Sequence, residues 1–185
     1  MAIKKIMFAQ LQKIDATKRT VTGVMVSETP DAANEIFDYD ASKAFFVDWS
    51  QHVSKSSGGK SLGNVRAMHQ PISAGKLVDI QFDDEARKIT CEAEIVDDGE
   101  WKKVEAGLYT GFSFGGKYVK KWKDPTDATK TRYSAKPHEV SLADLPCIPD
   151  ATFDLTKIDG STEAVKFATK EQSEFAAEED RKSVV

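Results

Sequence analysis

The chain has 185 residues, of which 40% are hydrophobic and 30% are charged, and its formal net charge is −4. This size and composition predict one globular domain with a tail, and they exclude a fibrous or wholly disordered chain. The acidic balance does not favour nucleic-acid binding, and no apolar run predicts a signal peptide or a membrane span. We therefore expect no membrane partner and a protein that stays in the compartment where it is made.

The two cysteines, Cys91 and Cys147, form no disulfide framework or metal-binding pattern. Such isolated cysteines are typical of reduced thiols in a cytosolic protein. His52, His69 and His138 show no metal-ligand spacing with them. The sequence thus predicts neither a metal nor another cofactor.

The first elements in chain order are two strands, over residues 3–11 and 19–26, where apolar and β-branched residues dominate. Residues 27–40 are acidic and contain a proline, which predicts a surface loop. Apolar residues at helical spacing predict a helix over 41–49, with Asp40 as its N-cap.

A Ser/Gly loop is expected over residues 54–61, and a short strand over 64–69 that ends before Pro71. Residues 76–82 and 87–96 then predict a hairpin, because both alternate between apolar and polar positions. The side chains expected on the buried face of its first arm are Val78, Ile80 and Phe82.

A short helix is predicted over 101–108, with Trp101, Val104 and Leu108 on one apolar stripe. The basic segment 117–123 favours the exposed end of a strand whose lysines protect its edge. A further strand is expected over 132–145.

Between these elements lies a segment with an unusual pattern. In an extended strand Phe112 and Phe114 point to one face, whereas Gly111, Ser113 and Gly115 point to the other. Glycines inside a strand often mark the close approach of a ligand or another backbone. We therefore interpret Ser113 as a hydroxyl with open space around it, available to a substrate backbone.

Together the elements predict an α+β fold that is mainly β, an antiparallel sheet with a few peripheral helices. We assign residues 1–158 to this domain and 159–185 to an acid-rich tail, helical from Ser161 or partly disordered.

Serine is a weak nucleophile unless a base lies within hydrogen-bond reach and a third group orients that base. His69 and His138 are expected at strand ends, and Glu139 follows His138 directly. The spacing around Ser113 also matches a nucleophile elbow, but that motif needs a helix after the serine, and here a strand continues.

The order of these residues resembles the prohead (capsid maturation) serine proteases of tailed bacteriophages, distantly similar to herpesvirus assemblins. The resemblance covers roughly residues 21–150 and is carried by three segments: a histidine in 66–69, a Gly-x-Ser-x-Gly strand in 110–115, and a Glu-Val-Ser-Leu strand in 138–146 that ends in proline.

The resemblance implies an assemblin-like serine endopeptidase with an antiparallel β-barrel-like sheet, with Ser113 as nucleophile and His69 as general base. The third member is either Glu139 or His138, and at most one of these neighbours is expected to reach His69, since adjacent strand residues face opposite sides.

The implied substrates are phage scaffold and capsid precursor proteins and the protease itself. The resemblance places cleavage inside the procapsid in the host cytoplasm. A homo-oligomer is one possible state of the protein. The alternative is a non-enzymatic capsid-assembly or scaffold-binding module built on the same β domain.

Overall fold

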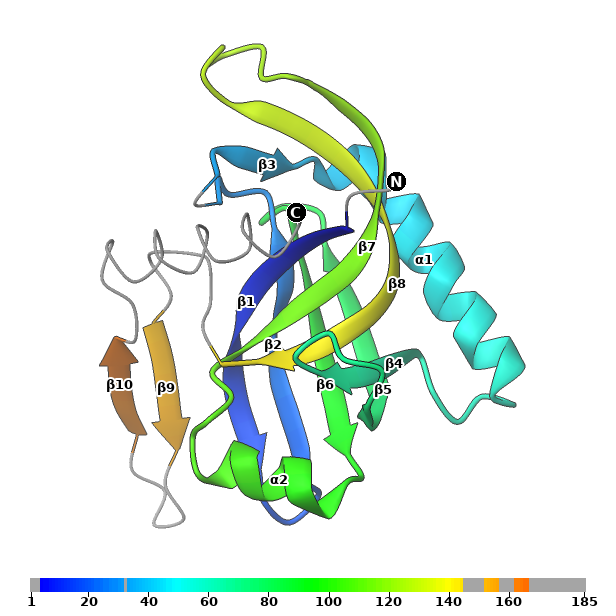
Figure 1. Cartoon of the computed structure of the whole chain (residues 1–185), viewed down its shortest axis with the longest axis vertical. Coiled ribbons are helices and arrows are strands. Elements are labelled where there is room, and N and C mark those ends of the chain that lie inside the picture. Colours follow the sequence, from blue (N-terminus) through cyan, green and yellow to red (C-terminus); the bar gives the residue numbers. More distant parts are fainter. Residues whose placement is uncertain (1–3, 32, 145–151, 157–161, 167–185) are drawn as a thin grey trace.

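The computed structural model describes residues 4–31, 33–144, 152–156 and 162–166, and it is mainly β with two helices. The ten strands, in chain order, are β1 (Lys4–Asp15), β2 (Thr20–Ser27), β3 (Glu35–Phe37), β4 (Gly63–Ala67), β5 (Ser73–Asp83), β6 (Lys88–Ile95), β7 (Gly111–Lys123), β8 (Thr131–Ala143), β9 (Thr152–Thr156) and β10 (Thr162–Lys166). The helices are α1 (Tyr39–Ser56) and α2 (Asp98–Glu105) (Figure 1).

Eight strands form one sheet in the order β3-β8-β4-β5-β6-β2-β1-β7, and β7 also pairs with β8. Most neighbours are antiparallel, which agrees with the predicted hairpins, but β3 and β4 both run parallel to β8. The expectation of a wholly antiparallel sheet is therefore wrong, and the sheet is mixed. A parallel pair needs a long crossover, and here β5, β6, α2 and β7 lie between β4 and β8 in the chain.

The helix α1 begins two residues earlier than the sequence predicted. Asp38, not Asp40, is its N-cap and accepts a hydrogen bond from the Ala41 N–H at 3.0 Å. The helix continues to Ser56, so it includes the start of the expected Ser/Gly loop. The preceding acidic segment also contains the short strand β3, which sequence alone presented as a loop.

The core forms where α1 packs on the apolar faces of β7 and β8. Phe46 of α1 meets Phe114 of β7 with ring centroids 5.2 Å apart, in an edge-to-face arrangement. Phe37 contacts both rings and Tyr133 of β8. Burial of these aromatic faces orients β7, because its alternate residues must then point to the opposite face.

The hairpin of β5 and β6 has the predicted position, and Ile80 and Phe82 of its first arm pack against the core as predicted, whereas Val78 does not. A register shift between Leu77 and Asp79 changes the alternation, so Leu77 is fully buried and Val78 is 39% exposed. A bulge of this kind reverses the side-chain faces beyond it.

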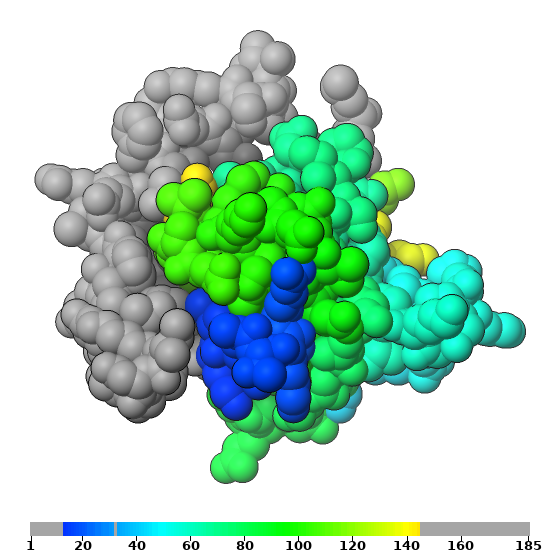
Figure 2. Space-filling model, turned by 90° about the horizontal axis from the view of Figure 1, so that it is seen from below, coloured from blue at the N-terminus to red at the C-terminus, as the bar shows by residue number. Residues whose placement is uncertain are grey.

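The helix α2 lies against the turn between β1 and β2, as the view from below shows (Figure 2). Arg19 of that turn pairs with Asp98 at 2.6 Å, and the Ile95 N–H donates to the Arg19 carbonyl. Trp101 and Val104 are buried as expected, whereas Leu108 lies beyond the end of the helix and is 58% exposed.

The C-terminal segments β9 and β10 form a two-stranded antiparallel sheet. Residues 162–166 are therefore extended where the sequence predicted a helical tail. The other predictions for that tail, and those for Cys147, concern residues outside the described ranges. Neither of the helices that the structure describes is long and apolar enough to cross a membrane.

Candidate active site

The strands β7 and β8 bring three polar side chains to one face. Their register places Ser113 opposite Ser141 and Gly115 opposite Glu139. Directly opposed residues of an antiparallel pair point to the same side of the sheet. The two serines and the carboxylate therefore share the face opposite to the buried phenylalanines.

The sequence predicts His69 at the end of a strand. In the structure β4 ends at Ala67, and His69 reaches this face from the tight turn that follows. After β4 the chain reverses at Met68 and His69, whose φ angles of 49° and 56° lie in the left-handed region. Non-glycine residues seldom adopt that conformation, and it recurs at functional sites. The Met68 N–H donates to the Leu142 carbonyl at 2.9 Å, and the His69 N–H donates to Ser141 Oγ at 3.0 Å.

The imidazole of His69 bridges the other two members of the set. Its Nε2 lies 2.8 Å from Ser113 Oγ, and its Nδ1 lies 2.5 Å from Glu139 Oε1. The hydrogen bond expected between Ser113 and a His69 ring nitrogen is thus present. Between the two alternatives for the third member, the structure makes Glu139 the residue bonded to Nδ1.

The site is enclosed. Ser113 is 0% exposed and Glu139 1%, whereas the His69 side chain keeps 16% of its surface. Burial acts to raise the pKa of Glu139, but the hydrogen bond and charge of His69, the Ser141 hydroxyl and the charge of His138 together lower it. Glu139 is consequently an anion at neutral pH.

The charge on Glu139 fixes the protonation of its neighbour. An ionised carboxylate only accepts hydrogen bonds, so Nδ1 of His69 must carry the proton that it donates to Oε1. A neutral ring with its proton on Nδ1 presents an unprotonated Nε2 to the Ser113 hydroxyl. This tautomer is the one that a general base requires.

Gly115 has a role that sequence reasoning assigned wrongly. A Cβ at this position would lie 1.9 Å from Glu139 Oε1, a distance that no real contact reaches. The space over Gly115 is therefore filled by the Glu139 carboxylate and is not open to a substrate backbone. Only glycine leaves room for that carboxylate opposite it.

Ser141 is the functional-site residue that sequence reasoning missed. It is fully buried and donates to Glu139 Oε2 at 2.7 Å while it accepts the His69 N–H. The signal was its position two residues after Glu139, which puts both on one strand face.

The remaining candidates lie away from this set. His52 is an exposed residue of α1, and Cys91 of β6 is a free thiol whose pKa is raised by complete burial. Within the described part of the chain, no group of three His, Cys, Asp or Glu side chains could hold a metal ion.

Comparison of the chain with protein-family models, curated proteins and solved structures gave no match. A functional proposal therefore rests on the geometry of Ser113, His69, Glu139 and Ser141.

Proposed function

We propose that the protein is a serine endopeptidase in which Ser113 is the nucleophile, His69 the general base and Glu139 the group that orients the base. The supporting observation is the unbroken chain of hydrogen bonds, 2.8 Å from Ser113 Oγ to His69 Nε2 and 2.5 Å from Nδ1 to Glu139 Oε1. A nucleophile, a base and an orienting acid in this sequence of contacts define catalytic triads on unrelated folds.

In the first step Ser113 Oγ attacks the carbonyl carbon of a peptide bond while His69 Nε2 takes the hydroxyl proton. The Glu139 carboxylate stabilises the imidazolium that results. His69 then gives this proton to the leaving amine, the C–N bond breaks, and an acyl group remains on Ser113.

In the second step His69 takes a proton from water, whose oxygen attacks the acyl carbon, and the Ser113 ester bond breaks. The proton returns to Ser113 Oγ. General-base catalysis of this kind typically contributes about a hundredfold to ten-thousandfold, and backbone N–H groups that bind the oxyanion contribute a comparable factor.

The substrates proposed for this enzyme are scaffold and capsid precursor proteins of a tailed bacteriophage, cleaved during head maturation inside the procapsid. This part rests on the resemblance of the His69, Ser113 and Glu139 segments to prohead proteases. The β8-β4-β5-β6-β2-β1-β7 order, with β7 also paired to β8, fits the barrel-like sheet of an assemblin-like fold. The alternative of a non-enzymatic assembly module assigns no role to the hydrogen-bonded triad.

Co-expression with the coat and scaffold precursors encoded beside the protein, followed by mass spectrometry of intact products, tests the proposal. We expect the wild type to shorten at least one precursor and Ser113→Ala to leave all of them intact. Ser134→Ala is the matched control, because Ser134 is also a buried serine but lies near the start of β8, whereas Glu139 and Ser141 lie near its end. Processing by Ser113→Ala at the wild-type rate would show that the nucleophile is wrongly assigned.

A further inference from the structure

The Ser141 hydroxyl joins the two elements that carry the base and its orienting acid. It accepts the backbone N–H of His69 from the β4–β5 turn at 3.0 Å, and it donates to Glu139 Oε2 on its own strand at 2.7 Å. Ser141 touches neither Nε2 of His69 nor Ser113 Oγ in these contacts. Any role in catalysis would thus act through His69 and Glu139.

We propose that Ser141 is a positioning residue of the triad: one hydroxyl holds the His69 turn over β8 and keeps the second oxygen of Glu139 in the acceptor state. This inference rests on the proposed function and extends it to a fourth residue. It assigns to Ser141 a role that a buried serine filling space would not have.

The proton count supports this assignment. A serine hydroxyl has one proton to donate and lone pairs to accept with. Because the His69 N–H occupies an acceptor position, the single hydroxyl proton is free to go to Glu139 Oε2. If Oε2 were protonated, Ser141 Oγ would have to accept from it and the Ser141 proton would lose this acceptor, so Ser141 favours the carboxylate over the acid.

Both oxygens of Glu139 are then satisfied by donors, Oε1 by the His69 ring and Oε2 by Ser141. A nearly fully buried carboxylate that loses one donor pays a desolvation penalty. The carboxylate would become a stronger base and would hold the protonated form of the His69–Glu139 pair more tightly.

The groups that act on Glu139 come from three elements. The His69 ring faces it from the turn, His138 adds its charge from β8, and Gly115 of β7 faces it without any charge. The Ser141 hydroxyl is the neutral donor among them. Its removal therefore changes the titration of the pair without any change in the number of charged groups.

The test compares Ser141→Ala, Ser141→Cys and Ser141→Thr in the full chain. Ala removes the hydroxyl, Cys keeps a side chain of similar size with a weak donor, and Thr retains the hydroxyl.

For Ala and Cys we expect kcat to fall roughly tenfold to a hundredfold, as loss of a hydrogen bond to a charged group predicts, with KM nearly unchanged. The acid limb of the pH profile of kcat should move to higher pH by roughly half a unit to one unit. Thr should restore both values.

Ser42→Ala is the matched control. Ser42 of α1 is also fully buried and accepts a backbone N–H, that of Ala135 in β8, at 3.2 Å. It should lower the melting temperature to a similar degree and leave the acid limb in place. A Ser141→Ala variant that loses stability as Ser42→Ala does, with an unmoved acid limb, would overturn the proposal.

A measurement without substrate separates this inference from the proposed function. The His69 ring signals, followed by NMR over pH in isotope-labelled protein, should titrate at higher pH in Ser141→Ala and Ser141→Cys than in the wild type. If the wild type cleaves no precursor, the peptidase proposal fails, and the ring titration still decides the role of Ser141. Identical titration curves in wild type and both variants would refute that role, even if Ser141→Thr does not fold.

Discussion

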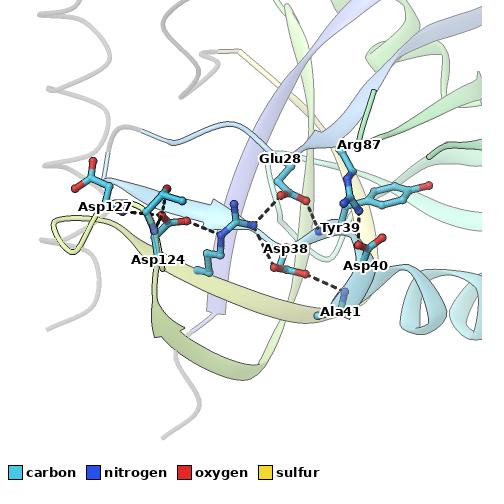
Figure 3. A network of polar contacts seen from close by, with 10 residues as sticks. Glu28, Asp38, Tyr39, Asp40, Ala41, Arg87, Asp124 and Asp127 are labelled. Carbon is cyan, nitrogen blue, oxygen red and sulfur yellow. Dashed lines mark hydrogen bonds and ion pairs between the residues drawn. The ribbon is translucent and has the colours of Figure 1, made fainter. Parts of the chain in front are cut away.

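The strand β8 carries two polar networks, one near each end, and they are built in opposite ways. Near its start, Arg132 holds three carboxylates: Nη1 lies 2.7 Å from Glu28 and 3.1 Å from Asp38, and Nε lies 2.5 Å from Asp124 (Figure 3). Near its end, Glu139 and Ser141 both form hydrogen bonds with His69. The first network joins one guanidinium to three carboxylates, whereas the second joins one carboxylate to an imidazole and two hydroxyls.

The Arg132 network fixes positions. Each of its carboxylates also accepts a backbone N–H, so that Glu28 binds Tyr39, Asp38 caps α1 through Ala41, and Asp124 holds its own turn. These contacts tie β2, the start of α1 and the β7–β8 connection to one guanidinium. The Ser113–His69–Glu139 chain instead runs in a line from a hydroxyl to a carboxylate, so that the imidazole can take the hydroxyl proton while the carboxylate keeps its charge. Saturated ionic contacts hold a structure in place, whereas a linear chain with an imidazole at its centre is suited to proton transfer.

The largest expected effect is on the linear chain. Ser113→Ala should lower the rate of precursor cleavage by about ten-thousandfold or more, since the attacking oxygen is gone. Its melting temperature should stay close to that of the wild type. Product analysis by mass spectrometry and a thermal melt check both halves, and a comparable loss of folded protein would mean that Ser113 is structural.

Next in size is the effect of Glu139→Gln, which we expect to reduce kcat by roughly ten-thousandfold. The glutamine amide can donate to Nδ1, so the imidazole can carry its proton on Nε2 instead. A protonated Nε2 cannot accept the Ser113 proton. His138→Gln on the adjacent position should keep kcat within about threefold, because side chains alternate along β8. Peptide hydrolysis assays decide the comparison, and the reverse order of effects would make His138 the third member.

A smaller effect is expected when the ionic network is broken. Arg132→Met should lower the free energy of unfolding by about 2–3 kcal/mol, since it leaves three partly buried carboxylates without their cation. Arg19→Met removes the exposed Arg19–Asp98 pair and should change that free energy far less. Urea denaturation measures both. Equal losses would show that the Arg132 contacts are no more than surface ion pairs.

The smallest effect is a dependence of stability on pH. The Thr126 hydroxyl and the Arg132 guanidinium lower the pKa of Asp124 below the usual value. A carboxylate with a lowered folded-state pKa contributes stability above its unfolded pKa of about 3.9 and loses it as pH falls. The free energy of unfolding should therefore decrease between about pH 4 and pH 2 in urea titrations, and Arg132→Met should flatten that decrease.

Local patterns in the sequence predicted much of the fold. The alternation in residues 76–96 and in 111–115 depends only on which face of a strand is buried, so the hairpin and the direction of Ser113 followed from it. Val78 was assigned to the wrong face because a bulge after Leu77 depends on the partner strand β6. The parallel pairing of β4 with β8 likewise joins segments about 75 residues apart, as with Val65 and Val140, which no local pattern reveals.

The candidate site was predictable in its members and not in its construction. Ser113, His69 and Glu139 are residue types with known chemical uses, so their order could be interpreted. The left-handed turn at Met68 and His69 is held by contacts to β8, and methionine seldom adopts that conformation, so the local sequence does not predict it. The position of Ser141 two residues after Glu139 puts both on one face of a strand, but only the pairing of β7 with β8 shows that Ser141 lies opposite Ser113.

The fit of Glu139 against Gly115 also bears on how this protein can change over time. Because a Cβ at position 115 would overlap the carboxylate, Gly115 cannot be replaced while Glu139 keeps its side chain in place. A larger side chain at 115 would require a shorter residue at 139, so descendants of this chain should change position 115 only together with position 139 or after it. Ser113 and Gly115 of β7 and the opposite residues Ser141 and Glu139 of β8 are thus expected to be retained as a set.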